Sequence, residues 1–287
     1  MNRIKFLLLL TTSLAVQFVM AQPGARLKLS SDYPSAGEKI TMTYDTAGAV
    51  TGGKKDLEAL VYFLDNKDYP VADIDLKPAA KLLTGEFSIP ANTKAFFIRI
   101  AGGNDIDNNN GKGYVYLVYN DKQPVEGAYA MKAYCLASLG KSYAKITPEL
   151  KEAAGLYQKE FELHPAGKKD YQKAYYYLIA TRPEYQDDVS RGISMLEKSN
   201  EESDLMLAVY LLSLRNSGSA DSLNAIIKTK FPGGLTVKNE MTDAFDKAGT
   251  VEKKDSVFNI LAKKYPEAAG DKSTSLDRFR LELAMGY

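Results

Sequence analysis

The chain of 287 residues has no tryptophan, one cysteine and one histidine. Cys135 is the lone cysteine, so an intramolecular disulfide is excluded, and its apolar helical surroundings predict a buried thiol. His164 precedes Pro165 at the end of a predicted helix, which is typical of a capping or surface histidine. A Gly-x-Ser-x-Gly elbow is absent, and a zinc site needs more His and Cys than the chain has. The sequence therefore predicts no catalytic residue, no metal ligand and no cofactor.

Strong charge of either sign is also lacking, since the formal net charge is +1. Nucleic-acid binding needs a clustered basic surface that replaces phosphate counterions, so a nucleic-acid partner is not expected. A polybasic membrane patch is not expected either.

Residues 1–21 have the pattern of a secretory signal peptide. Arg3 and Lys5 form a charged start, an apolar stretch interrupted by Gln17 follows, and Ala21 ends a cleavage motif. The apolar stretch is shorter than the ~20 residues of a membrane span. We therefore expect export to the periplasm or cell envelope, with no stable membrane span after cleavage. Removing Arg3 and Lys5 takes the net charge from +1 to −1.

Residues 22–122 read as short strands separated by Gly and Pro. Alternation of polar and apolar residues puts Ile40, Met42 and Tyr44 on one face, which is typical of a half-buried strand. About seven short strands in ~100 residues predict an immunoglobulin-like β-sandwich. The predicted strands are Ala25–Ser31, Lys39–Asp45, Glu58–Asp65, Val71–Asp75, Leu82–Ile89, Ala95–Ala101 and Tyr114–Asn120.

Residues 123–287 change to a helical pattern. The predicted helices are Glu126–Gly140, Pro148–Leu163, Asp170–Ala180, Tyr185–Lys198, Ser203–Arg215, Ala220–Lys230, Lys238–Ala248, Glu252–Lys264 and Ser275–Met285. We expect Pro148 in the first turn of its helix, with Thr147 as the N-cap. The last amphipathic segment has no helix stop signal, so we expect the chain to be truncated there.

An internal repeat runs through this helical half. The segment from Asp221 to Pro232 recurs from Asp255 to Pro266, and this offset matches the period of a tetratricopeptide repeat, about 34 residues. Leu163-His164-Pro165 lies close to two periods before Pro232. Because the small-residue positions of that repeat are only partly met, the prediction is a tetratricopeptide-like (TPR-like) helical array.

Three polar features are candidate sites. Asp105, Asp107 and Asn109 have the alternate spacing of calcium ligands, but the glycine comes one position late and Tyr116 stands where a glutamate is needed, so a polar loop between the last two strands is favoured. The neighbouring pairs Asp187-Asp188 and Glu201-Glu202 diverge by about 100° on a helix and should not share a site.

The third feature is the run Tyr175-Tyr176-Tyr177, whose side chains point in three directions on a helix. We expect one core tyrosine and two half-buried ones. The alternative is that one or two of them line a concave peptide-binding face. Carbohydrate binding is disfavoured but not excluded by the lack of tryptophan.

The chain has a predicted signal peptide, then a β-rich segment, then a helical array. In this order it resembles the N-terminal region of envelope thioredoxin-like disulfide reductases, the TlpA-like group of Bacteroidetes-type bacteria. The residues that carry the resemblance are Tyr33–Glu38, Asp107–Tyr114 and the Asp221/Asp255 repeat pair. In that family the chemistry belongs to a C-terminal thioredoxin domain with a Trp-Cys-x-x-Cys motif. None of those catalytic residues can be placed here.

Three hypotheses follow for function. The chain is a non-catalytic binding or scaffold region of such an oxidoreductase, with protein or peptide clients. Alternatively it is a stand-alone envelope interaction module of an uptake or assembly system. The third hypothesis is an enzyme of unrecognised type that uses paired carboxylates.

Overall fold

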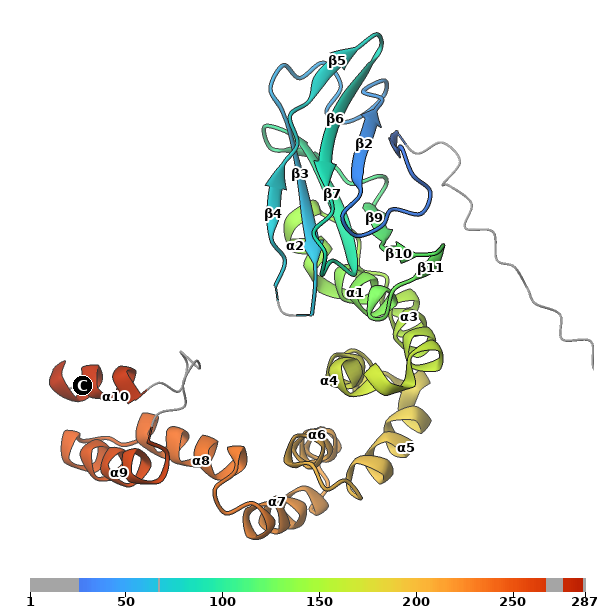
Figure 1. The fold of residues 1–287 in the computed structure, drawn as a ribbon. Coiled ribbons are helices and arrows are strands. Elements are labelled where there is room, and N and C mark those ends of the chain that lie inside the picture. The colour runs from blue at the N-terminus through green and yellow to red at the C-terminus, as the bar shows by residue number, and fades with distance from the viewer. Residues whose placement is uncertain (1–25, 67, 267–275, 286–287) are drawn as a thin grey trace, which may run out of the picture. The chain divides into compact units, whose positions relative to one another are not determined.

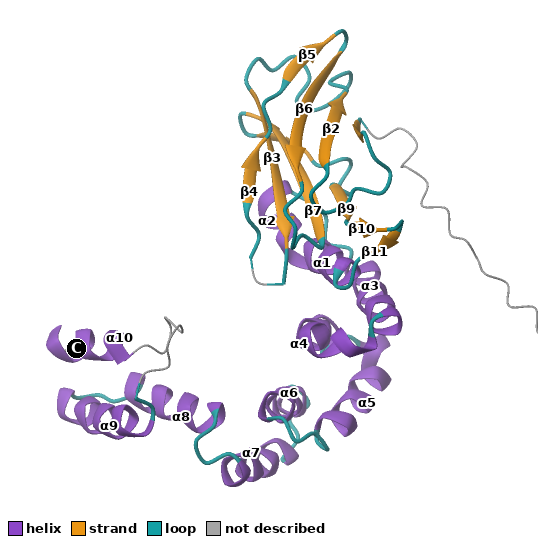
Figure 2. Ribbon diagram, viewed as in Figure 1, coloured by secondary structure: helices purple, strands orange, loops and turns teal. Residues whose placement is uncertain are grey.

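The computed structural model describes residues 26–66, 68–266 and 276–285 and has strands first and helices afterwards, as the sequence predicts (Figures 1 and 2). The predicted signal peptide, residues 1–21, lies outside the described residues. Among the described helices, none has both the length and the apolar character needed to cross a bilayer.

The chain divides into two compact units, Met1–Lys168 and Lys169–Tyr287. The change from strands to helices falls close to residue 123, as expected, but the boundary between the two compact units lies later in the chain, between Lys168 and Lys169. The first three helices therefore belong to the same unit as the strands.

Two antiparallel sheets form the β part of the first unit. The first sheet has the order β1-β2-β6-β5, and the second has the order β4-β3-β7-β8 with β9 also pairing with β7. The strands of the first sheet are β1 (Leu27–Leu29), β2 (Lys39–Tyr44), β6 (Leu82–Ser88) and β5 (Lys77–Ala79); those of the second are β4 (Val71–Asp73), β3 (Leu57–Leu64), β7 (Ala95–Gly102), β8 (Asp105–Asp107) and β9 (Tyr114–Leu117). The short hairpin β10 (Tyr119–Asn120) and β11 (Gln123–Pro124) leads into the helices.

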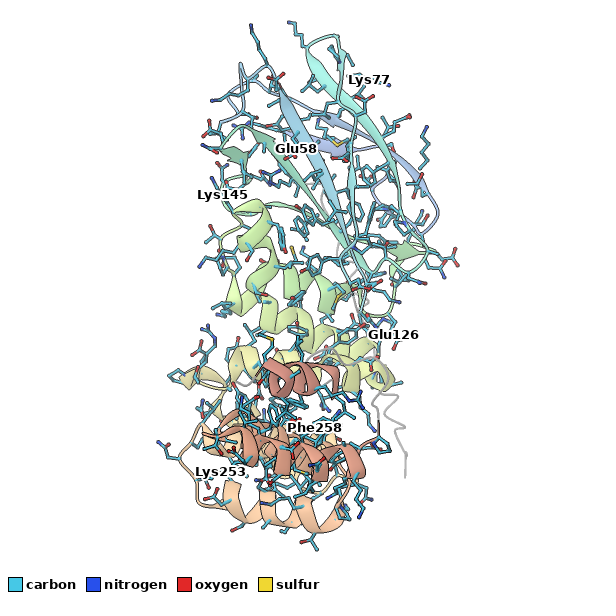
Figure 3. The ribbon with its side chains drawn as sticks, turned by 90° about the vertical axis from the view of Figure 1, so that its left-hand side faces the viewer. Glu58, Lys77, Glu126, Lys145, Lys253 and Phe258 are labelled. Atoms are coloured by element: carbon cyan, nitrogen blue, oxygen red, sulfur yellow. The ribbon has the colours of Figure 1, made fainter. Side chains whose placement is uncertain are left out.

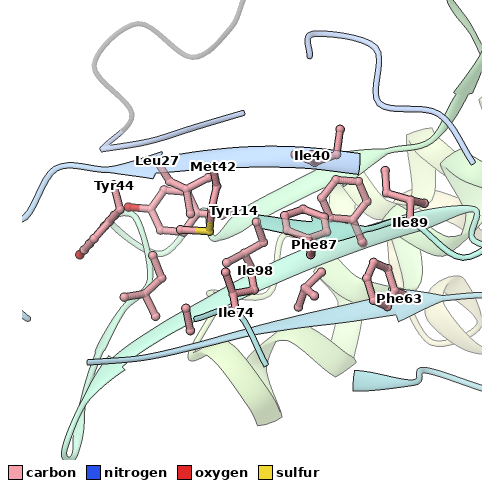
Figure 4. Packing of buried hydrophobic residues seen from close by; sticks show 14 of the residues in the cluster. Leu27, Ile40, Met42, Tyr44, Phe63, Ile74, Phe87, Ile89, Ile98 and Tyr114 are labelled. Carbon is pink, nitrogen blue, oxygen red and sulfur yellow. The ribbon is translucent and has the colours of Figure 1, made fainter. Parts of the chain in front are cut away.

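The core of this unit lies between the two sheets (Figure 4). Ile40, Met42 and Tyr44 all face it with no exposed surface, which confirms the face predicted from their alternation. Apolar residues of β7 reach the same core from the other sheet, as Ile98 does. Burial of such side chains stabilises the unit by ~1.5–3 kcal/mol each.

A helical layer covers the second face of the β3/β7 sheet. A nearly continuous helix, formed by α1 (Ala128–Tyr134), a π-helical turn (Cys135–Leu139) and α2 (Gly140–Ala144), contacts β7 and β9. Helix α3 (Leu150–Leu163) packs on α1. This cover explains why β7 reads as a continuous apolar run, because the strand is buried on both faces.

The second unit consists of helices packed in chain order. Each helix from α5 to α9 contacts the helix that follows it, and α6 also contacts α8. They are α4 (Lys168–Ile179, which begins at the unit boundary), α5 (Gln186–Leu196), α6 (Glu202–Ser213), α7 (Ser219–Lys230), α8 (Leu235–Asp246), α9 (Val251–Lys264) and α10 (Leu276–Met285). Because α4, α6 and α8 start at Lys168, Glu202 and Leu235, successive starts are about one repeat period apart.

Three helices of the chain end in the same way. The C-cap residues His164, Phe231 and Tyr265 have φ of −129°, −126° and −129° and ψ of 66°, 68° and 69°. Each donates its N–H to the carbonyl four residues earlier, and each precedes a proline. Because a proline disfavours the α conformation in the residue before it, the repeated X-Pro dipeptide sets where the helix stops.

Carboxylates from neighbouring helices cap the starts of two helices. Glu160 of α3, with 1% of its surface exposed, accepts hydrogen bonds from the N–H groups of Gly127 (2.7 Å) and Tyr129 (3.1 Å) at the start of α1. In the second unit Glu202 of α6 accepts from Leu235 (2.8 Å) and Thr236 (2.7 Å) at the start of α8. Each carboxylate satisfies two N–H groups that lack an intrahelical partner and lies at the positive end of the helix dipole.

The structure corrects several local predictions. Helix α3 begins at Leu150 with Glu149 as N-cap, so Pro148 precedes the helix and the expected N-cap role of Thr147 is wrong. The N–H of Thr147 instead bonds to Gly111 O at 2.8 Å. The segment 105–107, expected as a polar loop, is strand β8, and the short strand β5 was not predicted because its sequence has no alternation. The single helix predicted for Glu126–Gly140 contains a π-helical turn.

Replacing Glu160 by alanine should lower the free energy of unfolding of the first unit by ~1–3 kcal/mol, because the N–H groups of Gly127 and Tyr129 lose their acceptor. Urea unfolding followed by circular dichroism measures this change. The exposed Glu162 on the same helix provides the control, since Glu162→Ala should shift the stability by less than ~0.5 kcal/mol. Equal stabilities for the two variants would contradict the capping role of Glu160.

Candidate binding surfaces

The two residues best suited to catalysis occupy structural positions. His164 is the C-cap of α3, and its backbone carbonyl accepts a hydrogen bond from Gly167 N at 3.1 Å. Cys135 is fully buried at the start of the π-helical turn, and burial raises the pKa of its thiol to about 12. A protonated, buried thiol is a poor nucleophile.

The acidic loop that resembled a calcium loop is tied into the sandwich by hydrogen bonds. Asp107 has 5% of its surface exposed, and its Oδ2 accepts from the hydroxyls of Tyr44 (2.7 Å) and Tyr114 (2.9 Å). Its Oδ1 accepts from Asn109 N at 3.0 Å. Burial raises the pKa values of both tyrosines, so these hydroxyls remain donors at neutral pH. Both oxygens of Asp107 are thus engaged within the protein.

Lysines balance the remaining charge of this loop. Lys54 pairs with Asp105 at 2.9 Å, and Lys145, at the end of α2, donates to Asn104 O at 3.0 Å (Figure 3). Within the described ranges no group of three His, Cys, Asp or Glu side chains gathers as a metal site would require. The loop therefore anchors α2 to the sandwich.

The adjacent carboxylate pairs diverge, as expected from helix geometry. Glu202 caps α8, whereas Glu201 lies 3.8 Å from Lys169. Asp188 pairs with Arg191 and accepts from the hydroxyl of Tyr175 at 3.3 Å, and Asp187 is exposed. Neither pair places two carboxylates on one reacting atom.

The run of three tyrosines divides differently from the prediction. Tyr175 and Tyr176 are both buried, whereas Tyr177 has 49% of its surface exposed. The predicted single core tyrosine with two half-buried ones is therefore wrong. The difference arises because α4 buries two adjacent positions, 175 and 176, together with Tyr171 and Gln172, one turn earlier.

Tyr177 forms an aromatic pair with Tyr210 of α6. The ring centroids are 4.5 Å apart and the rings are tilted by 51°, an angle between stacked and edge-to-face packing. The ammonium of Lys173 lies 5.6 Å from the Tyr177 ring centroid. Helices α4 and α6 are also joined by Gln172 and Asp204, 2.7 Å apart, and both helices lie on the same side of α5 and α7 in Figure 1. We call Lys173, Tyr177 and Tyr210 the α4–α6 surface.

A second group of tyrosines lies in the first unit, beside the helical layer. Tyr143 of α2 contacts Tyr62 of β3 (5.2 Å between centroids) and Tyr69 in the β3–β4 loop (5.7 Å). Tyr62 is stacked on Phe97 at 4.5 Å, so the base of the group is buried while Tyr69 is 41% exposed. The Tyr69 and Tyr143 hydroxyls are 3.4 Å apart, and this contact raises the pKa of Tyr143. We call Tyr62, Tyr69 and Tyr143 the tyrosine shelf.

Sequence reasoning identified Tyr177 but missed Tyr210 and the tyrosine shelf. These residues lie far apart in the chain. Because the chain has 19 tyrosines, the sequence alone did not indicate which of them come together. The separation of Tyr177 and Tyr210 along the chain is close to the repeat period, and it is the one signal that could have paired them.

Comparison with known proteins gives no family assignment: no family model matches the chain, and no curated protein matches it either.

The thiol of Cys135 should resist labelling in the native protein. At pH 8 its raised pKa keeps it protonated and its burial blocks access, so an aromatic disulfide reagent should react only as the protein unfolds. The absorbance of the released thiolate, followed in buffer and in urea, measures this difference. Equally fast labelling in both solutions would show that the π-helical turn opens readily.

Proposed function

We propose that the chain is a non-catalytic binding and scaffold region of an envelope thiol–disulfide oxidoreductase of the TlpA-like, thioredoxin-like type. In this proposal the two β-sheets are an immunoglobulin-like sandwich and the helices after it are a TPR-like array. The signal peptide predicted at 1–21 supports a location in the periplasm or cell envelope. The reacting cysteines would belong to a thioredoxin domain outside this sequence.

The α4–α6 surface is the observation that carries the proposal. Tyr177 and Tyr210 are about one repeat period apart, as are the starts of the two helices that carry them, so successive repeats offer a tyrosine at nearly equivalent positions. Tyrosine gives a large, rigid contact with a polar tip at a small cost in side-chain entropy. Stacked helix pairs form extended surfaces that suit peptide segments. An unfolded client chain is the kind of ligand that such a surface fits.

The alternative function is a stand-alone interaction module of an envelope uptake or assembly system. It uses the same surfaces and differs only in what the polypeptide is attached to. The intact mass of the native protein, together with the reading frame after Tyr287, separates the two. A longer product with a Cys-x-x-Cys motif supports the oxidoreductase, whereas a product without it favours the alternative.

Substitution of Tyr177 and Tyr210 tests client binding separately. A reduced, unfolded secretory protein with a fluorescent label serves as the probe, and its affinity is measured by anisotropy. Tyr177→Ala and Tyr210→Ala should each weaken binding about tenfold, because a buried aromatic contact at an interface is worth ~1–2 kcal/mol.

The matched control is Ile260→Ala on α9, where the isoleucine is 60% exposed. This variant should leave the affinity unchanged. If the control weakens binding as much as the tyrosine variants do, the probe binds apolar surface in general and the assignment to the α4–α6 surface is wrong.

A further inference from the structure

Strand β4 is an edge strand of the second sheet, and it pairs with a neighbouring strand on one side. Among the described residues, β3 is the sole strand that pairs with it. Phe63 N bonds to Pro70 O at 2.9 Å and Ile74 N bonds to Ala59 O at 2.8 Å, so residues 70, 72 and 74 face β3. In an antiparallel ladder the alternate residues point their N–H and C=O away from the partner strand. The main-chain groups of Val71 and Asp73 therefore point outward, where another strand can pair with them.

Exposed apolar surface lies next to this edge. Val71 is directly opposite Tyr62 in the register, so the two side chains share the face on which the tyrosine shelf lies. Val71 is 48% exposed and Tyr69 is 41% exposed, whereas Tyr62 beneath them is 6% exposed. An added strand would place alternate side chains over Val71 and Tyr69, and these contacts would favour apolar residues there.

Among the described residues, the exposed charged side chains nearest to Val71 are acidic. Asp68 and Asp73 are both exposed, on either side of Val71. On the outer face of β3, Glu58 is paired with Arg99 and so adds no net charge (Figure 3). Two copies of this chain that paired through β4 would bring these aspartates near each other, which opposes self-association. Complementary charge requires lysine or arginine in the incoming strand.

We propose that the β4 edge binds an extended, basic segment of a partner protein by β-strand addition. Main-chain hydrogen bonds to Val71 and Asp73 hold the segment in register. On the face that carries the tyrosine shelf, its apolar residues lie beside Tyr69 and Val71, and a basic residue lies beside Asp73, two positions farther along β4. A second basic residue, past the apolar ones, faces Asp68. This site lies in the first unit and does not depend on the client surface of α4 and α6.

The probe is a short labelled peptide, Lys-Thr-Val-Thr-Val-Lys, measured by fluorescence anisotropy with the full chain. Paired antiparallel to β4, it places its first lysine beside Asp73, its two valines beside Val71 and Tyr69, and its last lysine beside Asp68. Compared with the same peptide carrying glutamate for lysine, it should bind at least tenfold more tightly, since complementary and opposing rim charges both contribute. Asp73→Lys should weaken it about fivefold. Val71→Pro removes an outward N–H and crowds the edge, so it should weaken binding about tenfold.

Folding of the variants is checked separately. The N–H of Val71 does not serve the ladder with β3, so Val71→Pro should unfold at nearly the temperature of the parent protein. Asp68→Lys, in the loop before β4, should weaken binding even if Val71→Pro does not fold. The α4–α6 variant Tyr177→Ala should leave peptide binding unchanged.

Three results would overturn the proposal. The first is that neither peptide binds, and the second is that the lysine and glutamate peptides bind equally well. The third is a concentration-dependent dimer of the free protein that Val71→Pro abolishes, since this would identify a second copy as the partner of β4.

Discussion

Each of two helix starts in this protein depends on a carboxylate supplied from another helix. Glu160 holds the start of α1, and α1 is the helix that covers the β3/β7 sheet. Glu202 holds the start of α8, and Gly234 allows it to do so, because a Cβ at that position would collide with the carboxylate. Because the first N–H groups of a helix have no intrahelical partner, each carboxylate satisfies two of them and links its own helix to another, α3 to α1 and α6 to α8.

The ends of the helices follow a second, local rule that the sequence already contains. His164, Phe231 and Tyr265 have nearly the same backbone angles because each precedes a proline. A repeated stop gives helix pairs of similar length, and pairs of similar length bring equivalent positions of successive repeats together. Tyr177 and Tyr210, whose rings are in contact, are about one repeat period apart and fit this regularity.

Much of the secondary structure could be predicted from the sequence, because periodicity and proline act locally. All nine predicted helices and seven predicted strands have counterparts in the structure. The missed features depend on distant partners. The sequence around Asp107 predicted a loop, because the neighbouring residues do not show that Asp107 accepts hydrogen bonds from the hydroxyls of Tyr44 and Tyr114. The tyrosine shelf, which joins β3, a loop and α2, could not be predicted from the sequence either, because it forms by packing between distant segments.

Our two proposals assign client binding to the α4–α6 surface and the binding of an extended partner segment to the β4 edge. Hydrogen exchange of the full chain, with and without a reduced, unfolded client, tests the client-binding claim most directly. We expect slower exchange on client binding in 168–179 and 202–213, the segments of α4 and α6, with little change in 219–230 of α7. Slower exchange confined to α7 and α9, with none in α4 or α6, would contradict this claim.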